Sequence, residues 1–305
     1  MNSLLCPPGE GVYAVHTAKD KKKNLHQKLY GGNDPDKIRK SWQKSWNNLS
    51  KKKAVMLGIC SDSGGGILRG ANWGPLYLRE SLLKEKLSIL DLGDIRVVPH
   101  LLHDKYLNKQ ILMKCRKALY GSTDNNYPVA PLSITEYFCD AFYREHPDKR
   151  IFAIGGDHSV SYPLVKSYIT AKKKQGKHVS LIHFDAHTDL MDERLGVDIC
   201  FASWVSPIIP LLQKPDHVIQ IGIRSSGQDK SYWEEKKGVK QYWISDVLKQ
   251  GQEKIGEEIV TFLKKEKIDE IYVSFDIDAI DWEYAGATGT PEPGGLLPHQ
   301  AITIL

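Results

Sequence analysis

The sequence has no apolar run long enough to cross a membrane. Its longest apolar stretches, Ile151 to Ile154 and Val179 to Ile182, fall far short of the roughly 18 to 20 residues that a membrane-spanning helix needs. The first residues carry neither a basic segment nor a long apolar segment, so no secretory signal is predicted. We therefore expect no membrane partner and a cytoplasmic location.

Cysteine is scarce, and its spacing argues against two common structural roles. The five cysteines are an odd number, widely spread, and no two form a CxxC pair. This pattern fits reduced thiols better than a disulfide framework or a zinc clip. Lysine runs at 21–23, 51–53 and 172–174 lack interleaved aromatic residues, so they indicate solvated surface and no nucleic-acid partner.

The chain is expected to form one large domain with an N-terminal extension. Its 305 residues, 41% hydrophobic and 26% charged, are enough for one sizeable core. Residues 1–52 are polar, rich in lysine and interrupted by proline and glycine, which is typical of a segment that lies on a domain. We expect an α/β domain over 53–305.

Short apolar runs alternate with helical patterns from residue 54 onward. Strands are predicted at 54–60, 94–98, 150–156, 179–187, 217–224 and 270–278. Helices are predicted at 74–86, 135–144, 161–173 and 245–265, the last beginning at Ser245, with a short helix over 37–48. This alternation predicts βαβ units and a mainly parallel sheet, with ligands beyond the carboxyl ends of the strands.

Acidic and histidine residues follow three of the predicted strands. Asp185, His187 and Asp189 stand at alternate positions, and alternate side chains of an extended chain share one face. Asp276 and Asp278 have the same spacing after a later strand. The two groups are therefore expected to converge on one site.

His158 completes the candidate set from the loop after the strand at 150–156, where two glycines allow a tight turn. Carboxylates and imidazoles without a thiolate suit Mn²⁺ better than zinc. Four carboxylates in one cleft repel one another, and a total metal charge near +4 compensates them. The alternative is that each cluster caps a helix or turn, as Asp157 and Ser159 are placed to do. Three such clusters at three strand ends favour the metal site.

Several motifs resemble the signature segments of the ureohydrolase family, which includes arginases, agmatinases and formimidoylglutamases. They are GGDHS, FDAHTD and SFDIDAID followed by ATGTPEPGG, with LGICSDSGGG and GANWGPLYLRE upstream. The resemblance runs from about residue 54 to the end. It implies a three-layer α/β/α sandwich around a mainly parallel sheet of about eight strands, and a homo-oligomer, either a trimer or a hexamer.

The resemblance also implies two manganese ions per chain. One is held by His158, Asp185, Asp189 and Asp276, and the other by Asp185, His187, Asp276 and Asp278. The implied reaction is hydrolysis of a guanidino or amidino C–N bond by a metal-bridging hydroxide, releasing urea or a formamide-type product. Asp189 is the implied base. Agmatine, guanidinobutyrate-like acids and formiminoglutamate are the candidate small-molecule substrates.

The chain departs from the family at its proton shuttle. Arginases and agmatinases carry a histidine some 10 to 15 residues after the second motif, whereas here Ile199 or Phe201 falls at that place, and no histidine lies between His187 and His217. Another group must then protonate the leaving amine, or turnover is slow, or the substrate differs. The alternative is a non-catalytic metal-binding homologue that serves as a structural or regulatory subunit.

Residues near the predicted substrate loop differ from arginases as well. Ser225 and Ser226 stand where arginases present aspartates for the α-amino acid head, which makes L-arginine a less favoured substrate. Trp204 and Glu292 are the candidate substrate-binding residues, with core packing for Trp204 and a turn for Glu292 as alternatives.

His183 is expected to be a buried, hydrogen-bonded histidine that faces away from Asp185. The chain ends about where relatives continue into a helix and strand with a substrate-facing glutamate, so either it is truncated or that edge is built differently.

Overall fold

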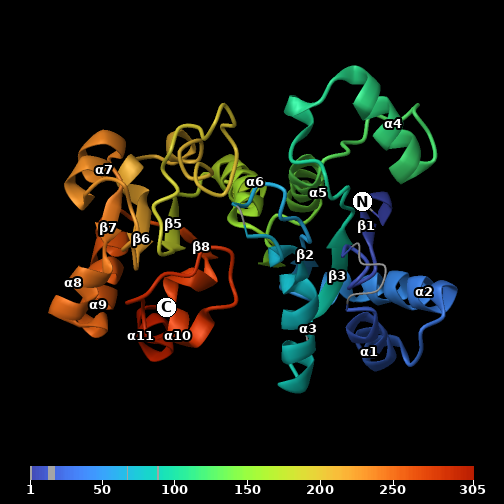
Figure 1. Cartoon of the computed structure of the whole chain (residues 1–305), viewed down its shortest axis with the longest axis horizontal. Helices are drawn as coiled ribbons and strands as arrows, with labels where there is room; N and C mark the ends of the chain where they lie inside the picture. The colour runs from blue at the N-terminus through green and yellow to red at the C-terminus, as the bar shows by residue number, and fades with distance from the viewer. Residues whose placement is uncertain (1, 13–17, 67, 88) are drawn as a thin grey trace. The chain divides into compact units, whose positions relative to one another are not determined.

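The computed structural model describes residues 2–12, 18–66, 68–87 and 89–305. They fall into two compact units, one of Met1–Gly64 with Arg69–Leu164 and the other of Gly65–Leu68 with Val165–Leu305. Each unit holds a four-stranded sheet (Figure 1). The predicted α/β class with mainly parallel strands is confirmed, and the strands of the described residues are divided between the two units, four in each.

The first unit is built on the strand order β1-β3-β2-β4. Its strands are β1 (Leu5–Cys6), β2 (Ala54–Gly58), β3 (Leu90–Ile95) and β4 (Arg150–Ile154). β2 pairs in parallel with β3 and β4, and β1 pairs antiparallel with β3. Its helices are α1 (Lys19–Tyr30), α2 (Pro35–Ser45), α3 (Gly74–Lys84), α4 (Lys109–Tyr120) and α5 (Pro131–Glu145).

A buried arginine ties helix α3 to strand β3 in this unit. The guanidinium of Arg79 is 1% exposed and bonds Asp91 at 2.7 Å and Asp94 at 2.5 Å. Burial lowers the pKa of Arg79, but the two carboxylates outweigh burial and raise it above its ordinary value. Each charge is therefore paired inside the unit, as buried charges must be.

Residues 1–52 contribute β1, α1 and α2 to the first unit, and the boundary predicted at residue 52 stays a prediction. Helix α1 is rich in lysine, so its sequence reads as a polar segment. It nevertheless buries Leu25 completely, and Leu25 packs with Cys60, Leu76 and Val97. One apolar stripe on a charged helix was therefore enough to attach it.

The second unit has the strand order β7-β6-β5-β8, and every pairing is parallel. Its strands are β5 (Val179–Phe184), β6 (Val218–Ile221), β7 (Lys240–Tyr242) and β8 (Glu270–Phe275). Its helices are α7 (Lys230–Lys237), α8 (Ile244–Gln250), α9 (Gln252–Lys265), α10 (Trp282–Ala285) and α11 (Pro298–Ile304), and α6 (Ser161–Lys174) ends in it.

Helices α8, α9 and α11 supply the apolar core of the second unit against its sheet. Phe184 and Ile221 of the sheet pack with Val247, Ile255 and Ala301 of these helices. The helix predicted over 245–265 is two helices, because Gly251 adopts φ 88° and interrupts it. The first of them is capped at Trp243 and not at Ser245.

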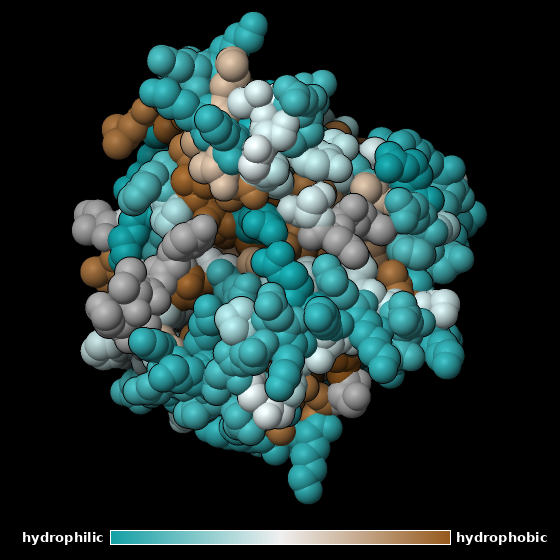
Figure 2. Space-filling model, turned by 90° about the vertical axis from the view of Figure 1, so that its right-hand side faces the viewer, coloured by the Kyte–Doolittle hydropathy of each residue, from teal (hydrophilic) through white to brown (hydrophobic). Residues whose placement is uncertain are grey.

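The surface is mostly hydrophilic on the face shown in Figure 2. The lysine runs agree with this for most members, since Lys23, Lys51 and Lys174 are exposed. Lys172 differs, because it is 1% exposed and lies 3.4 Å from Glu270. Among the helices of the described residues, none is both long and apolar enough to span a bilayer.

Candidate metal centre

Strand β5 delivers the first carboxylate of the centre. It lies between β6 and β8, and the ladder continues one residue beyond it, because the Asp185 amide donates to Ile221 O at 3.1 Å. Asp185 is 1% exposed. Its Oδ1 accepts from the His187 amide at 2.7 Å, so the chain turns around this carboxylate.

The neighbouring strand β8 delivers Asp276 and Asp278. The Asp276 amide donates to Phe184 O of β5 at 2.9 Å, and Asp276 Oδ1 accepts from the Asp278 amide at 3.0 Å. The strand therefore does not continue through both residues as its spacing suggested. Instead, Asp276 caps the 3₁₀ turn Ile277–Ala279, and Asp278 becomes almost fully buried within it.

Two groups of possible ligand atoms result within the second unit, each with its atoms within 4.8 Å of one another. One contains Asp185, His187 and Asp278, and His187 Nδ1 lies 3.3 Å from both Asp185 Oδ1 and Asp278 Oδ2. The other contains His183, Asp185 and Asp189. Asp185 belongs to both, which is the position of a bridging ligand.

The pKa values of this centre reflect uncompensated negative charge. Burial, followed by the charges of Asp185 and Asp276, raises the pKa of Asp278 to about 7. Burial lowers the pKa of His187, but hydrogen bonds to Asp185 and Asp278 outweigh it and raise the pKa to about 11. A cation at this place would supply the missing positive charge. These oxygen and imidazole donors, with no thiolate among them, fit a divalent ion such as Mn²⁺.

Asp189 adopts an unusual backbone conformation, and its side chain accepts a hydrogen bond from Trp204. Its φ is 52°, a left-handed value that few residues other than glycine adopt. Its Oδ2 accepts from Trp204 Nε1 at 2.8 Å, and the Trp204 side chain is fully buried. Such strained residues cluster at functional sites. A direct contact between Trp204 and substrate stays a prediction, while its contact with Asp189 is a finding.

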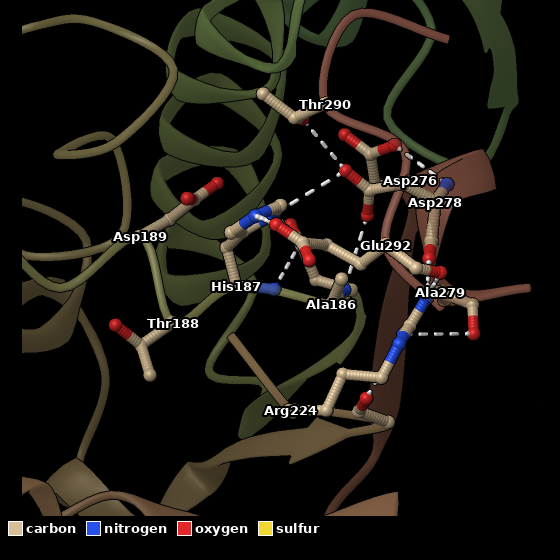
Figure 3. A network of polar contacts seen from close by, with 12 residues as sticks. Ala186, His187, Thr188, Asp189, Arg224, Asp276, Asp278, Ala279, Thr290 and Glu292 are labelled. Carbon is tan, nitrogen blue, oxygen red and sulfur yellow. Dashed lines mark hydrogen bonds and ion pairs between the residues drawn. The ribbon is translucent and has the colours of Figure 1, made fainter. Parts of the chain in front are cut away.

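The segment after β8 supports the centre through Thr290, which the sequence did not single out, and through Glu292, which it did. Thr290 Oγ1 donates to Asp278 Oδ2 at 2.9 Å, and Glu292 Oε1 lies 3.3 Å from His187 Nε2 (Figure 3). Arg224 donates to the carbonyls of Asp278 at 2.7 Å and Glu292 at 2.7 Å. A carboxylate on the outer nitrogen of a metal-binding histidine orients its ring. Substrate binding by Glu292 stays a prediction.

His183 is buried and hydrogen-bonded as expected, but it faces Asp185 and not away from it. Its Nε2 lies 2.8 Å from Asp185 Oδ2. The reason is the period of two in an extended chain, which puts residues 183 and 185 on one face. The ring also packs edge-on against Trp204, with ring centroids 5.1 Å apart.

His158 belongs to the first unit, where it begins the 3₁₀ turn that follows β4. Asp157 caps that turn by accepting from the Ser159 amide at 2.9 Å, so the capping interpretation holds for Asp157. His158 as a ligand stays a prediction.

In the segment where relatives have a shuttle histidine, Ile199 is buried and the Arg194 guanidinium lies over the Phe201 ring, 5.1 Å from its centroid.

Comparison with known proteins identifies the class. Residues 52–305 match the family described as "Arginase family". The guanidinobutyrase of Pseudomonas aeruginosa is 28% identical over 93% of this chain and 85% of that protein. The mitochondrial guanidino acid hydrolase of Homo sapiens is 29% identical over 83% of this chain and 66% of that protein. The solved arginase of Bacillus caldovelox shares the fold, with a TM-score of 0.62 and 24% identity over 83% of this chain and 85% of that one.

The chain therefore belongs to the arginase family. Its relatives include guanidinobutyrase, agmatinase and formimidoylglutamase, and the class is that of hydrolases acting on amidino C–N bonds.

Proposed function

We propose that this protein is a manganese-dependent hydrolase of a guanidino or amidino compound. The observation that carries the proposal is the double role of Asp185, whose carboxylate belongs to both groups of ligand atoms in the second unit. A carboxylate that belongs to both groups fits a pair of metal ions a few ångströms apart.

The proposed ligands are the six residues predicted from the sequence. They are His158, Asp185, His187, Asp189, Asp276 and Asp278. Two bound divalent ions lower the pKa of a water, so that hydroxide is available near neutral pH. Electrostatics supports the proposal as well, because the buried carboxylates of Asp185, Asp189 and Asp278 are costly without a cation.

The side chains around the centre have separate proposed roles in the reaction. Asp189, fixed by the Trp204 indole at 2.8 Å, would orient the attacking water and accept its proton. Glu292, held near His187 Nε2, keeps that ring oriented, and its partly exposed carboxylate faces the guanidinium of a substrate. The product is urea, or a formamide-type compound when the substrate is an amidine.

A guanidino acid is the substrate class to test first. Two relatives are named for guanidino acids, guanidinobutyrase and guanidino acid hydrolase. Ser225 and Ser226 lack the carboxylates that would pair with an α-amino group, and they leave room for an acid without one. Agmatine and formiminoglutamate are the alternatives.

The test is release of urea, ammonia and formamide from a panel of guanidinobutyrate, guanidinopropionate, agmatine, arginine and formiminoglutamate after manganese loading. Asp189→Asn is expected to abolish release, because the amide accepts no proton. Asp192→Asn is the matched control, since Asp192 is an exposed residue three positions away that pairs with Lys237. Equal activity of the two variants would exclude the proposed role of Asp189.

A non-catalytic role as a structural or regulatory subunit is the second candidate. Phe201, under the Arg194 guanidinium, stands where relatives have the shuttle histidine. Bound manganese with no release from any member of the panel would favour it. The trimeric or hexameric assembly and the cytoplasmic location stay predictions, to be tested by light scattering and cell fractionation.

A further inference from the structure

A chain of buried hydrogen bonds runs behind the candidate centre in the second unit. Trp243 Nε1 donates to Gln241 Oε1 at 3.1 Å, and Gln241 Nε2 donates to Gln220 Oε1 at 2.7 Å. Gln220 Nε2 lies 2.8 Å from His183 Nδ1, and His183 Nε2 lies 2.8 Å from Asp185 Oδ2. Both glutamines and His183 are 2% exposed or less.

The donor and the acceptor of each hydrogen bond in this series follow from the chemistry of Trp243, its first member. An indole N–H only donates, so the Gln241 atom that faces Trp243 must be its oxygen. The amide nitrogen of Gln241 then faces Gln220 and must meet its oxygen. The amide nitrogen of Gln220 is left for His183.

The Thr188 carbonyl confirms the orientation of Gln220 independently. Gln220 Nε2 donates to Thr188 O at 2.6 Å, and a carbonyl only accepts. Its second hydrogen points to His183 Nδ1, so both hydrogens of this buried amide are used. His183 Nδ1 is therefore the acceptor, and a neutral ring then carries its hydrogen on Nε2.

We propose that the hydrogen-bond relay formed by Trp243, Gln241 and Gln220 fixes His183 as the Nε2–H tautomer. His183 is then a positioning residue for Asp185. In this state His183 donates to Asp185 Oδ2 and offers no lone pair on the side of the centre. It is therefore excluded as a metal ligand, although its ring lies within the group formed with Asp185 and Asp189. The inference that this positioning supports metal binding rests on the proposed function.

The positioning matters because Asp185 is the carboxylate common to both groups. One of its oxygens is held by the His187 amide and the other by His183. The ring of His183 is itself fixed by its edge contact with Trp204. Outer hydrogen-bond partners of metal ligands typically contribute roughly 10- to 100-fold to metal affinity.

The direct test is side-chain ¹⁵N NMR of the metal-free protein labelled at histidine, with His183 assigned from a His183→Gln variant. The expected spectrum has a protonated Nε2 and an unprotonated Nδ1 for His183. A protonated Nδ1, alone or together with Nε2, would overturn the relay.

Replacing the side chain that donates to His183 Nδ1 gives a second test of the same proposal, again read from the hydrogen positions of His183. In Gln220→Glu an ionised carboxylate only accepts, so residue 220 no longer donates to His183 Nδ1 and accepts from it instead. A hydrogen on His183 Nδ1 is therefore expected. Manganese affinity, measured by calorimetry, should fall roughly tenfold. A merely structural role would not change the tautomer.

Gln220→Met is the milder variant in case the buried charge prevents folding. It removes the amide that donates to His183 Nδ1. Weaker manganese binding is expected. The control is Gln213→Met, since Gln213 is an exposed glutamine of the same unit with one hydrogen bond to Lys177 O. An unchanged manganese affinity in Gln220→Met would overturn the positioning role of His183.

The two proposals fail separately. If the protein binds no manganese, the proposed function fails, while the tautomer of His183 in the metal-free protein still decides the relay. If manganese binds and substrate is hydrolysed but His183 carries its hydrogen on Nδ1, the relay fails and the proposed function stands.

Discussion

The indole of Trp204 donates to Oδ2 of Asp189 at 2.8 Å, from a fully buried position 15 residues further along the chain. This bond holds a carboxylate whose backbone adopts a left-handed φ of 52°. Trp204 was expected at the substrate, and the structure gives it a contact with the proposed base.

Trp204→Phe removes this bond and keeps an aromatic ring in place. Asp189 then loses the bond that fixes its Oδ2, so kcat is expected to fall roughly tenfold with little change in KM, in line with the loss of a partner behind a functional group. Steady-state kinetics on the best substrate measure this. The control is Trp42→Phe, because Trp42 is another buried indole, bonded to Leu92 O. Equal kcat values for the two variants would contradict the positioning role.

Thr290→Val tests the support of Asp278 by the segment after β8. The valine is isosteric but no longer donates to Asp278 Oδ2, so manganese affinity is expected to fall roughly tenfold. Titration calorimetry measures it. Thr303→Val, which removes an exposed hydroxyl bonded to His299 O, should leave the affinity unchanged. The account is wrong on this point if both variants bind manganese like the unmodified protein.

Arg224→Lys tests the attachment of the same segment to the loop that follows β6. The guanidinium reaches the carbonyls of Asp278, Glu292 and Pro293 at 2.7 to 2.9 Å, and an ammonium group lacks this planar fork. We expect the free energy of unfolding to fall by about 2 kcal/mol. Urea unfolding measures the change. Arg116→Lys, which alters one bond to Tyr127 O, should lower the free energy of unfolding by less than half as much. Equal losses in the two variants would refute the stabilising role of Arg224.

Arg79→Met tests the buried ion pairs of the first unit. It leaves Asp91 and Asp94 without their cation in a buried site, which typically costs about 3 to 5 kcal/mol. Urea unfolding of the metal-free protein isolates this effect from the centre. Lys21→Met breaks an exposed pair with Glu80 and should change stability far less, because water screens this pair. A similar small effect for Arg79→Met would show that its pairs contribute little.

The sequence pointed to the candidate ligands that follow β5 and β8, but not to the side chains that support them. Asp185 and His187 meet through a local turn and not through an extended strand, and Asp276 and Asp278 do the same, so both pairs depend on a few neighbouring residues. The bonds of Thr290, Arg224 and Gln220 join segments 12 to 68 residues apart. No local pattern predicts such contacts, since they depend on how the strands pair.

The helices and strands that the sequence analysis missed or merged also have local explanations. β1 and β7 have two and three residues, which is too short for a period of two to be visible. The predicted helix over 245–265 ignored Gly251, whose positive φ separates α8 from α9. Helix α1 was missed because its lysines hid the single stripe around Leu25.

The most direct test of the central claim is the number of manganese ions bound per chain, measured by metal analysis in the unmodified protein and in two variants. The account predicts two ions in the unmodified protein. It predicts the loss of both in Asp185→Asn, because Asp185 is shared, and the loss of one in Asp278→Asn. No bound manganese in the unmodified protein, or equal stoichiometry in the two variants, would contradict a binuclear centre bridged by Asp185.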